Sequence, residues 1–288
     1  GSANVSGLTH QKGSIDTLSL KDVTASKDKN ILSAQTSSIS GSGLQANDHG
    51  TVQNLDASDI SVGSDGHTHN LVVDSLSVGS LSENHMGTTF ENASLQNFSV
   101  AGTSTSSFDA ALDQASVRNA NVNGAHVENA SLIGGKASVN EDNASAVVDS
   151  LLFNDARYKD QLHIESGQAK NLNLSGNHNH QNASVDSIDM NGIHSSFPNI
   201  RTDIDNATLT NGNVSHQGQG KGSVNVNSVA VNGIGFEAQD TLITGNSYNN
   251  NVDPIKVDVD KNKLVASTLA RVDNADINAK AQMIAGTY

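Results

Sequence analysis

Two pairs of histidines have a spacing that suits metal binding. His67 and His69 are separated by one residue, and so are His178 and His180. On a β-strand, residues i and i+2 share a face, so each pair could chelate a divalent metal. Both pairs also come just before a strong copy of a sequence repeat, and a polar corner residue of that repeat would recur in the same way. The metal site is therefore a prediction with a structural alternative, and no other cofactor is expected.

Two carboxylates could support acid–base chemistry. Asp203 and Asp205 fall on one face of a strand, beside Arg201, and paired carboxylates of this kind hydrolyse glycosides. Such enzymes also need aromatic platforms on which sugars stack, and this chain has six Phe, three Tyr and no Trp. The sequence shows neither a nucleophile elbow nor a Ser/His/Asp set. We therefore expect a protein that is not an enzyme.

A short phrase of alternating apolar and polar residues must position all of these groups. Its strongest copies begin at Ile15, Val73, Val148, Val185 and Val226, and with weaker copies between them the steps run from 15 to 22 residues. The alternation has a period of two, which is typical of a half-buried strand. A nearly fixed repeat length indicates one structural unit stacked on copies of itself.

Small and polar residues fill the intervals between the strands. Gly, Asn, Asp and Ser tolerate the positive φ that sharp corners need, as in Gly41-Ser42-Gly43, Gly134-Gly135 and Asn191-Gly192. The stretch from Ala115 to Gly135 reads in fives and locally resembles a pentapeptide-repeat helix. Together these features predict a parallel β-solenoid (β-helix) of about a dozen rungs of roughly 20 residues. Its expected inward residues are Leu18, Ile60, Leu76, Leu151, Ile188 and Val229.

The repeat also suggests how the chain is divided. Residues 1–12 read as an N-terminal tag or cap, 13–246 as the β-solenoid repeat domain, and 247–288 as a C-terminal cap or the start of a following module. Hydrophobic residues make up 35% of the chain and aromatic residues 3%. A thin solenoid needs few inward residues on each strand, so it accounts for this composition better than a compact globule does.

The charge balance and the missing apolar segment exclude several partners. The net charge is −14, and the 16 basic residues are scattered. Nucleic-acid binding needs a stripe of Lys and Arg, so we expect no nucleic-acid partner, and the same charge disfavours anionic membranes. No apolar run of about 18 residues occurs, so we expect no direct membrane insertion.

The phased Leu and Val strands, the Asn-Ala-Ser corners, the acidic balance and the lack of cysteine resemble the β-solenoid stalks of secreted bacterial adhesins and autotransporter passengers. The resemblance implies an extracellular location at the bacterial cell surface. It implies a structural or adhesive module that presents a long polar surface to a host or bacterial glycan or protein, or to copies of itself.

Two alternatives stay open. One is a phage tailspike-like or glycan-active β-helix, which would need carboxylates and aromatic residues gathered in one groove. The other is a periplasmic lipid-conduit protein with an open, apolar-lined β-groove. That alternative requires longer strands and a more apolar interior than short solenoid rungs would give.

Overall fold

A computed structural model describes residues 1–278 apart from 47–48, 84–86, 105, 198–199, 218–220, 239–240, 251–254, 261–262 and 268–271. The side chains of residues 200, 221 and 234 onward also lie outside the description. The described part is all-β, as the sequence predicts, and contains no helix. Of the predicted C-terminal segment 247–288, only the backbone of several strands is described.

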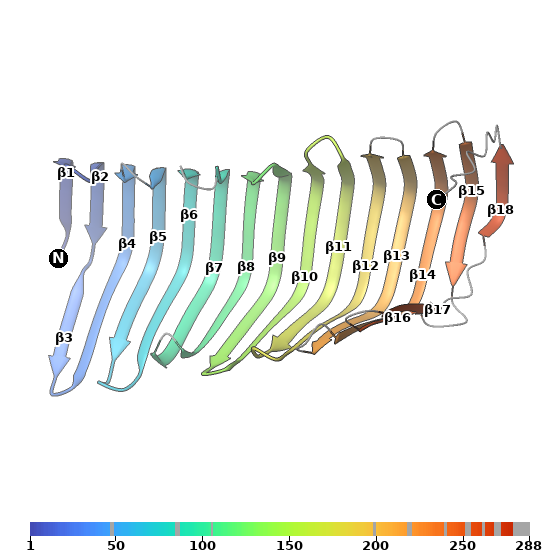
Figure 1. Ribbon diagram of the computed structural model, residues 1–288. Coiled ribbons are helices and arrows are strands. Elements are labelled where there is room, and N and C mark those ends of the chain that lie inside the picture. Colours follow the sequence, from blue (N-terminus) through green and yellow to red (C-terminus); the bar gives the residue numbers. More distant parts are fainter. Residues whose placement is uncertain are drawn as a thin grey trace. The chain divides into compact units, whose positions relative to one another are not determined.

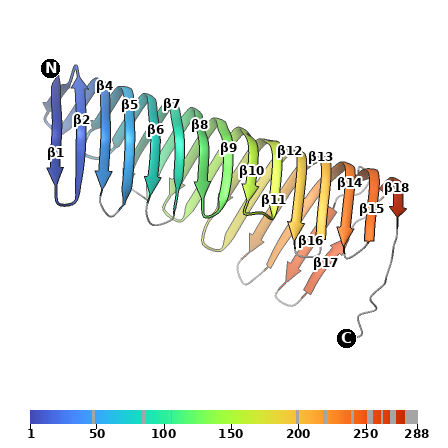
Figure 2. The same cartoon turned by 90° about the horizontal axis from the view of Figure 1, so that it is seen from above.

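The chain divides into two units, and β10 (Asn143–Tyr158) and β11 (Leu162–Gly176) contribute residues to both. The N-terminal unit comprises Gly1–Leu151 and Asn173–Asn177. In both views its long strands β4 to β9 lie side by side in chain order (Figures 1 and 2). The strands that lie wholly within it are β1 (Ala3–His10), β2 (Gly13–Lys21), β3 (Thr24–Asp28), β4 (Ile31–Ala46), β5 (Gly50–Ser64), β6 (His69–Glu83), β7 (Thr89–Ser104), β8 (Ser107–Val122) and β9 (Ala125–Asn140).

The C-terminal unit comprises Leu152–Leu172 and His178–Tyr288. Its long strands β12, β13 and β14 pair in chain order, and β14 also pairs with β15 and β16. The strands that lie wholly within it are β12 (His180–Phe197), β13 (Ile200–Gln217), β14 (Lys221–Ala238), β15 (Thr241–Asn250), β16 (Ile255–Asp260), β17 (Lys263–Ser267) and β18 (Val272–Asn278).

The prediction of a parallel solenoid is wrong, because the described strand pairs are antiparallel. Each repeat of about 20 residues is one long strand followed by a short hairpin turn, where the prediction has a rung of short strands. β4, β7, β8 and β9 each have 16 residues, and β12 to β14 each have 18. A repeated amphipathic phrase looks the same whether the next copy runs parallel or antiparallel to it.

Each long strand is bent, as Figure 1 shows for β4 to β9. The bends coincide with positions that interrupt the pairing ladder. Between β12 and β13 the ladder skips Asp186 opposite Asn211, and then Gly192 opposite Asp205. Gly192 and Asn211 have positive φ values of 57° and 49°. These corners therefore divide a strand into flat facets, and Gly and Asn occupy them because they tolerate the left-handed conformation.

Each long strand has two corners, which differ in a fixed order along the chain. The first corner is usually an acidic residue. The second corner follows six residues later and has the left-handed conformation. The pairs include Asp16 with Asp22, Asp113 with Asn119, Glu128 with Gly134, Asp149 with Asp155, Glu165 with Asn171, Asp186 with Gly192, and Asp205 with Asn211. Because neighbouring strands are antiparallel, the acidic corner of one strand lies beside the left-handed corner of the next. The sequence prediction of Gly and Asn corners is confirmed at Gly43, Gly134, Gly192, Asn211 and Gly233.

One face of each bent sheet is concave and apolar. A Cβ atom built on Gly135 would lie 3.1 Å from Cδ2 of Leu132, on the facet before the corner, and 3.1 Å from Cγ of Leu112 on the neighbouring strand. A Cβ on Gly212 would similarly lie 2.9 Å from Cδ2 of Leu209. Side chains on consecutive facets therefore converge on this side of the strand.

Cross-strand partners continue this apolar face from strand to strand. In the N-terminal unit one row joins Leu20, Ile39, Ala57, Leu76, Leu95, Ala115 and Leu132. In the C-terminal unit Ile188, Leu209 and Val229 are partners in the same way.

The predicted inward residues lie on this face, but they do not form one stack. Leu76 belongs to the row just described, whereas Leu18 pairs with Gly41 in the neighbouring row and Ile60 lies beyond a corner. Leu18, Ile60 and Leu76 are half-buried, as are Leu151, Ile188 and Val229, and Ser77 is exposed as predicted. The face is therefore oriented as the alternation predicts, but it is not sealed.

Candidate functional site

The concave apolar face of the N-terminal unit, called the trough below, is the first candidate site. Across its end facet, Leu44, Val52, Leu81 and Phe90 are successive cross-strand partners. All four are half-buried. Strand alternation places them on one side, and the corners turn neighbouring facets toward them. The trough is thus an apolar surface that runs across the strands, because each successive strand contributes an apolar side chain at the same position.

Part of the trough is a hollow of about 470 Å³. Its floor includes Ile15, Leu44, Val52 and Leu81, and polar residues at its edge include Gln45, His49, Thr51 and Glu83. A volume of this size falls within the range of small-molecule sites, and an apolar floor with a few polar groups at the rim is their usual composition.

The trough lacks the cover that such a face normally has. In most domains an apolar sheet face packs against a second layer of helices or strands. Among the described residues no helix is present, and the only buried hydrophobic side chains are Ala57 at 8% and Val226 at 7% exposure. Leu8, whose cross-strand partner Ile15 lines the hollow, is 53% exposed. The trough therefore leaves much apolar area in contact with water.

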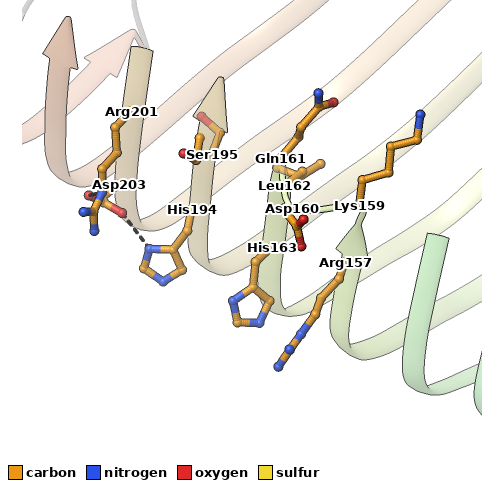
Figure 3. Close-up of a pocket in the computed structure, with 11 residues that line it drawn as sticks. Arg157, Lys159, Asp160, Gln161, Leu162, His163, His194, Ser195, Arg201 and Asp203 are labelled. Carbon is orange, nitrogen blue, oxygen red and sulfur yellow. Dashed lines mark hydrogen bonds and ion pairs between the residues drawn. The ribbon is translucent and has the colours of Figure 1, made fainter. Parts of the chain in front are cut away.

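A second candidate, called the polar cluster below, lies in the C-terminal unit (Figure 3) and has two halves. In the first, Arg157 donates to both oxygens of Asp155, with Nε–Oδ1 at 2.7 Å and Nη2–Oδ2 at 2.9 Å. Nε2 of His163 lies 2.9 Å from the same Oδ1 atom. Figure 3 shows Arg157, His163 and His194 extending from three neighbouring strands toward the same side.

The second half of the polar cluster centres on Asp203. Its Oδ1 is 2.8 Å from Nδ1 of His194, and its Oδ2 accepts a 3.0 Å hydrogen bond from Nε of Arg201. His194 and Asp203 are direct cross-strand partners, which is why their side chains meet. On the other side of the ring, Nε2 of His194 lies 3.9 Å from Oε1 of Glu165. The rings of His163 and His194 are 5.7 Å apart and connect the halves.

Electrostatics hold both carboxylates in the ionised form. The hydrogen bonds from Arg157 lower the pKa of Asp155, with a further contribution from His163. The hydrogen bond from His194 lowers the pKa of Asp203, and the charge of Arg201 acts in the same direction. Donors that bind the charged form of a carboxyl group make it harder to protonate. Both carboxylates therefore stay ionised to a lower pH than usual, whereas a general acid would need the opposite pKa shift.

The structure places the predicted metal residues at hairpin turns. His67 lies in the turn between β5 and β6, where Oδ1 of Asp65 accepts the backbone N–H groups of Thr68 at 2.6 Å and His67 at 2.8 Å. These bonds lower the pKa of Asp65. His69 begins β6, His178 lies in the turn before β12, and His180 begins β12. All four side chains are exposed.

These turn positions agree with the alternative interpretation, in which the four histidines are polar corner residues of the repeat. Within the described residues, no three His, Cys, Asp or Glu side chains gather in a way that could hold a metal ion. The metal site stays a prediction, to be checked by calorimetry with zinc and by His→Ala substitution at one pair.

The two carboxylates of the predicted pair, Asp203 and Asp205, have different surroundings in the structure. Asp203 belongs to the polar cluster, whereas Asp205 occupies an acidic corner next to the left-handed Gly233. Sequence reasoning did not identify His163, His194, Arg157 or Asp155. The signal that could have found them is the corner spacing, which identifies Asp155 and Gly192 as left-handed corners and Glu165 and Asp205 as acidic corners near these residues.

The described residues include no helix long and apolar enough to cross a membrane. No protein-family model, curated protein or solved structure matches this chain.

Proposed function

We propose that this protein is a non-catalytic module that binds the hydrocarbon part of an amphiphile in its trough. The observation that carries the proposal is the row Leu44, Val52, Leu81 and Phe90, which is apolar from strand to strand and only half-buried. Removing apolar surface from water contributes roughly 25 cal/mol for each Å². A ligand that covers this row would therefore gain the hydrophobic free energy that folding alone does not provide.

The shape of the trough favours a linear chain as its occupant. The same strand position recurs at each step of the sheet, about 4.8 Å apart, so the cross-section stays nearly constant. An unbranched hydrocarbon fits a surface of constant cross-section, whereas a protein partner would meet pockets of different sizes. The inward glycines Gly41 and Gly135 are buried and deepen the trough locally.

The long strands remove the sequence-based objection to an apolar β-groove. That alternative needed longer strands and a more apolar interior than short rungs would provide. β5 and β6 have 15 residues each, and five positions of β6 place Leu71, Val73, Leu76, Val78 and Leu81 on the concave side. An extracellular location at the bacterial cell surface stays a proposal and rests on the resemblance to the stalks of secreted adhesins.

An adhesive surface module is the second candidate, and the outward face favours it. Asp74 and Ser77 on β6 are exposed, and polar residues recur at matching outward positions. Many outward hydroxyl groups are already engaged across strands, however, as in Ser58 with Ser75 and Ser94 with Ser116, both at 2.7 Å. Groups that satisfy each other contribute less to binding a glycan.

One experiment separates the two candidates. The protein is titrated with a fluorescent long-chain fatty acid, and the variants Leu44→Asn and Ser77→Asn are compared with it. Leu44 lies in the trough on β4, and Ser77 is an exposed outward residue of β6, two strands away. We expect saturable binding that Leu44→Asn weakens and Ser77→Asn leaves unchanged. Binding to a glycan array without fatty-acid binding would favour the adhesive module.

A further inference from the structure

The polar cluster borders a second hollow, of about 410 Å³, in the C-terminal unit. This hollow, called the lip pocket below, lies where β10 ends, β11 begins, β12 ends and β13 begins. The backbone N–H of Ser196 donates to the carbonyl of Gln161 at 2.9 Å, which joins the β10–β11 turn to the end of β12. The pocket is lined by Arg157, Lys159, Asp160, Gln161, Leu162, His163, His194, Ser195, Ser196, Arg201 and Asp203.

From this arrangement we infer that the lip pocket binds an oxyanion, such as the phosphate, sulfate or carboxylate group of a ligand. Its wall holds three basic residues, Arg157, Lys159 and Arg201, and two carboxylates, Asp160 and Asp203. Asp155, which is outside the wall, binds Arg157 and balances its charge. The chain as a whole carries a net charge of −14, so the pocket wall lacks the excess of acidic residues that characterises the rest of the molecule.

The carboxylates of the cluster hold its basic groups in fixed orientations. Asp203 already receives donors from His194 and Arg201, and Asp155, behind the wall, receives Arg157 and His163. Arg201 uses Nε for Asp203, and within the described residues its terminal amino groups make no hydrogen bond to protein. A guanidinium group held in this way presents a planar fork of donors, which matches the geometry of an oxyanion.

Lys159 and His194 complete the donor set. Nζ of Lys159 lies 5.1 Å from the centre of the Tyr158 ring, an aromatic contact that leaves its N–H groups able to reach a ligand. Figure 3 shows Lys159 directed away from the side on which Arg157 and His163 extend, so cations occupy both sides of the turn. The carboxylate of Glu165, 3.9 Å from His194, is the nearest competing acceptor for that ring.

A metal ion is a poorer occupant than an anion. Within the described residues no three His, Cys, Asp or Glu side chains form a metal-binding group. Arg157 and Arg201 lie directly beside the carboxylates that would have to bind the ion. Their permanent charges repel a cation and attract an anion at the same distance.

The lip pocket also contacts the apolar side of its strands through Leu162. Leu162 is half-buried and precedes Ile164, which lies on the same face of β11 by strand alternation. The tail of an amphiphilic anion bound here would lie on this apolar side of β11. The anion site itself stands on the pocket alone.

The test uses sulfate as the probe, because its charge does not change near neutral pH, whereas inorganic phosphate gains or loses a proton there. The intact protein is titrated with sodium sulfate and followed by NMR chemical shifts, with sodium chloride at equal ionic strength as reference. Arg201→Gln and Lys159→Gln should each weaken saturable sulfate binding at least about fivefold. Lys170→Gln is the matched control, because Lys170 is an exposed lysine of β11 outside the pocket wall.

A histidine variant gives a second readout. His194→Gln should also weaken sulfate binding, because it removes a ring donor of the pocket wall and the partner that orients Asp203. An absence of saturable sulfate binding, or an equal loss in Lys170→Gln, would overturn the anion site.

A final comparison identifies the source of the anion. Decyl phosphate below its micellar concentration is compared with inorganic phosphate and with decanol. Tighter binding of decyl phosphate than of both would support a lipid head group in the lip pocket, and equal affinity for both phosphates would support a free anion. If sulfate binds while fatty acids do not, the lip pocket stands and the trough proposal fails; the reverse pattern means that the lip pocket fails.

Discussion

Nδ2 of Asn97 donates a 2.7 Å hydrogen bond to Oδ2 of Asp113 across the corner shared by β7 and β8. Asn97 is the left-handed corner of its strand, with φ of 50°, and Asp113 is the acidic corner of the next. The same relationship recurs where Nδ2 of Asn171 donates to Asp186 and Nδ2 of Asn119 donates to Glu91, both at 2.7 Å. These corners bend the strands and so create the trough.

Substitutions at Asn97 should separate the contribution of the side-chain hydrogen bond from that of the left-handed backbone conformation. Asn97→Gly keeps the left-handed conformation but removes the amide, so we expect a loss of about 0.5–1.5 kcal/mol in the free energy of unfolding. Asn97→Ala removes the amide and also places a Cβ in a left-handed residue, which adds roughly 1 kcal/mol. Urea denaturation measures both. Equal stability of the two variants would contradict a conformational role for this corner.

Gly134→Ala should be more damaging than an equivalent change at Gly87. Both glycines have φ of 63°, so both variants carry the same backbone strain. A Cβ on Gly134 would clash with Oδ2 of Asp149, whereas a Cβ on Gly87 would meet nothing within 4 Å. We expect the difference in unfolding free energy to shrink when Asp149→Ala is combined with Gly134→Ala in a double-mutant cycle. Additive effects would show that the two residues do not interact.

Leu76→Ala should cost about 1–3 kcal/mol, less than a substitution in a sealed core. Leu76 lies between Ala57 and Leu95 but stays half-buried, so part of its surface already contacts water. Ser77→Ala, on the exposed side, should change the stability by no more than about 0.5 kcal/mol. Chemical denaturation of both variants checks the strand orientation. A larger loss for Ser77→Ala would mean that the concave and outward faces are exchanged.

The stability of the C-terminal unit should fall in acid. The folded pKa values of Asp155 and Asp203 lie below the ordinary value of 3.8, so the folded state binds protons less readily than the unfolded state. Their stabilising contribution is therefore present above the ordinary pKa and is lost as the pH falls through the folded values. Thermal melts at pH 6 and at pH 3 should show a smaller decrease for Asp155→Asn than for the unaltered protein. A decrease of the same size would exclude the Arg157 ion pair as a source of the acid sensitivity.

The sequence predicts the strands, their faces and their corners, because each depends on local residues. The alternation around Leu76 and the glycines at 134 and 192 fix these features directly. The direction of pairing depends on how the chain returns after each turn, and the repeat phrase contains no information on this.

A second signal could have revealed the antiparallel pairing. The acidic corners Asp113, Glu128, Asp149, Glu165 and Asp186 follow one another at steps of 15, 21, 16 and 21 residues. In a parallel coil all turns are equivalent, so the steps should be uniform. Alternating long and short steps indicate two kinds of turn at opposite ends of the strands, as in a series of hairpins.

The polar cluster was harder to predict for a related reason. His194 and Asp203 meet because they are partners across an antiparallel ladder, whereas a parallel rung would place residues one repeat apart side by side. The wrong strand direction thus gives the wrong neighbours for each outward side chain. Only Asp203 and Arg201, two residues apart on one strand, could be associated from the sequence alone.

The most direct test of the trough is whether a hydrocarbon chain lies on its floor. A photoactivatable fatty acid with its reactive group near the end of the tail is bound, irradiated and located by peptide mass spectrometry. The account predicts that the label attaches to β4, β5 and β6 around Leu44, Val52 and Leu81, and that Leu44→Asn reduces the label there while Ser77→Asn does not. Labelling spread over the outward residues, or no saturable labelling, would contradict a hydrocarbon-binding trough.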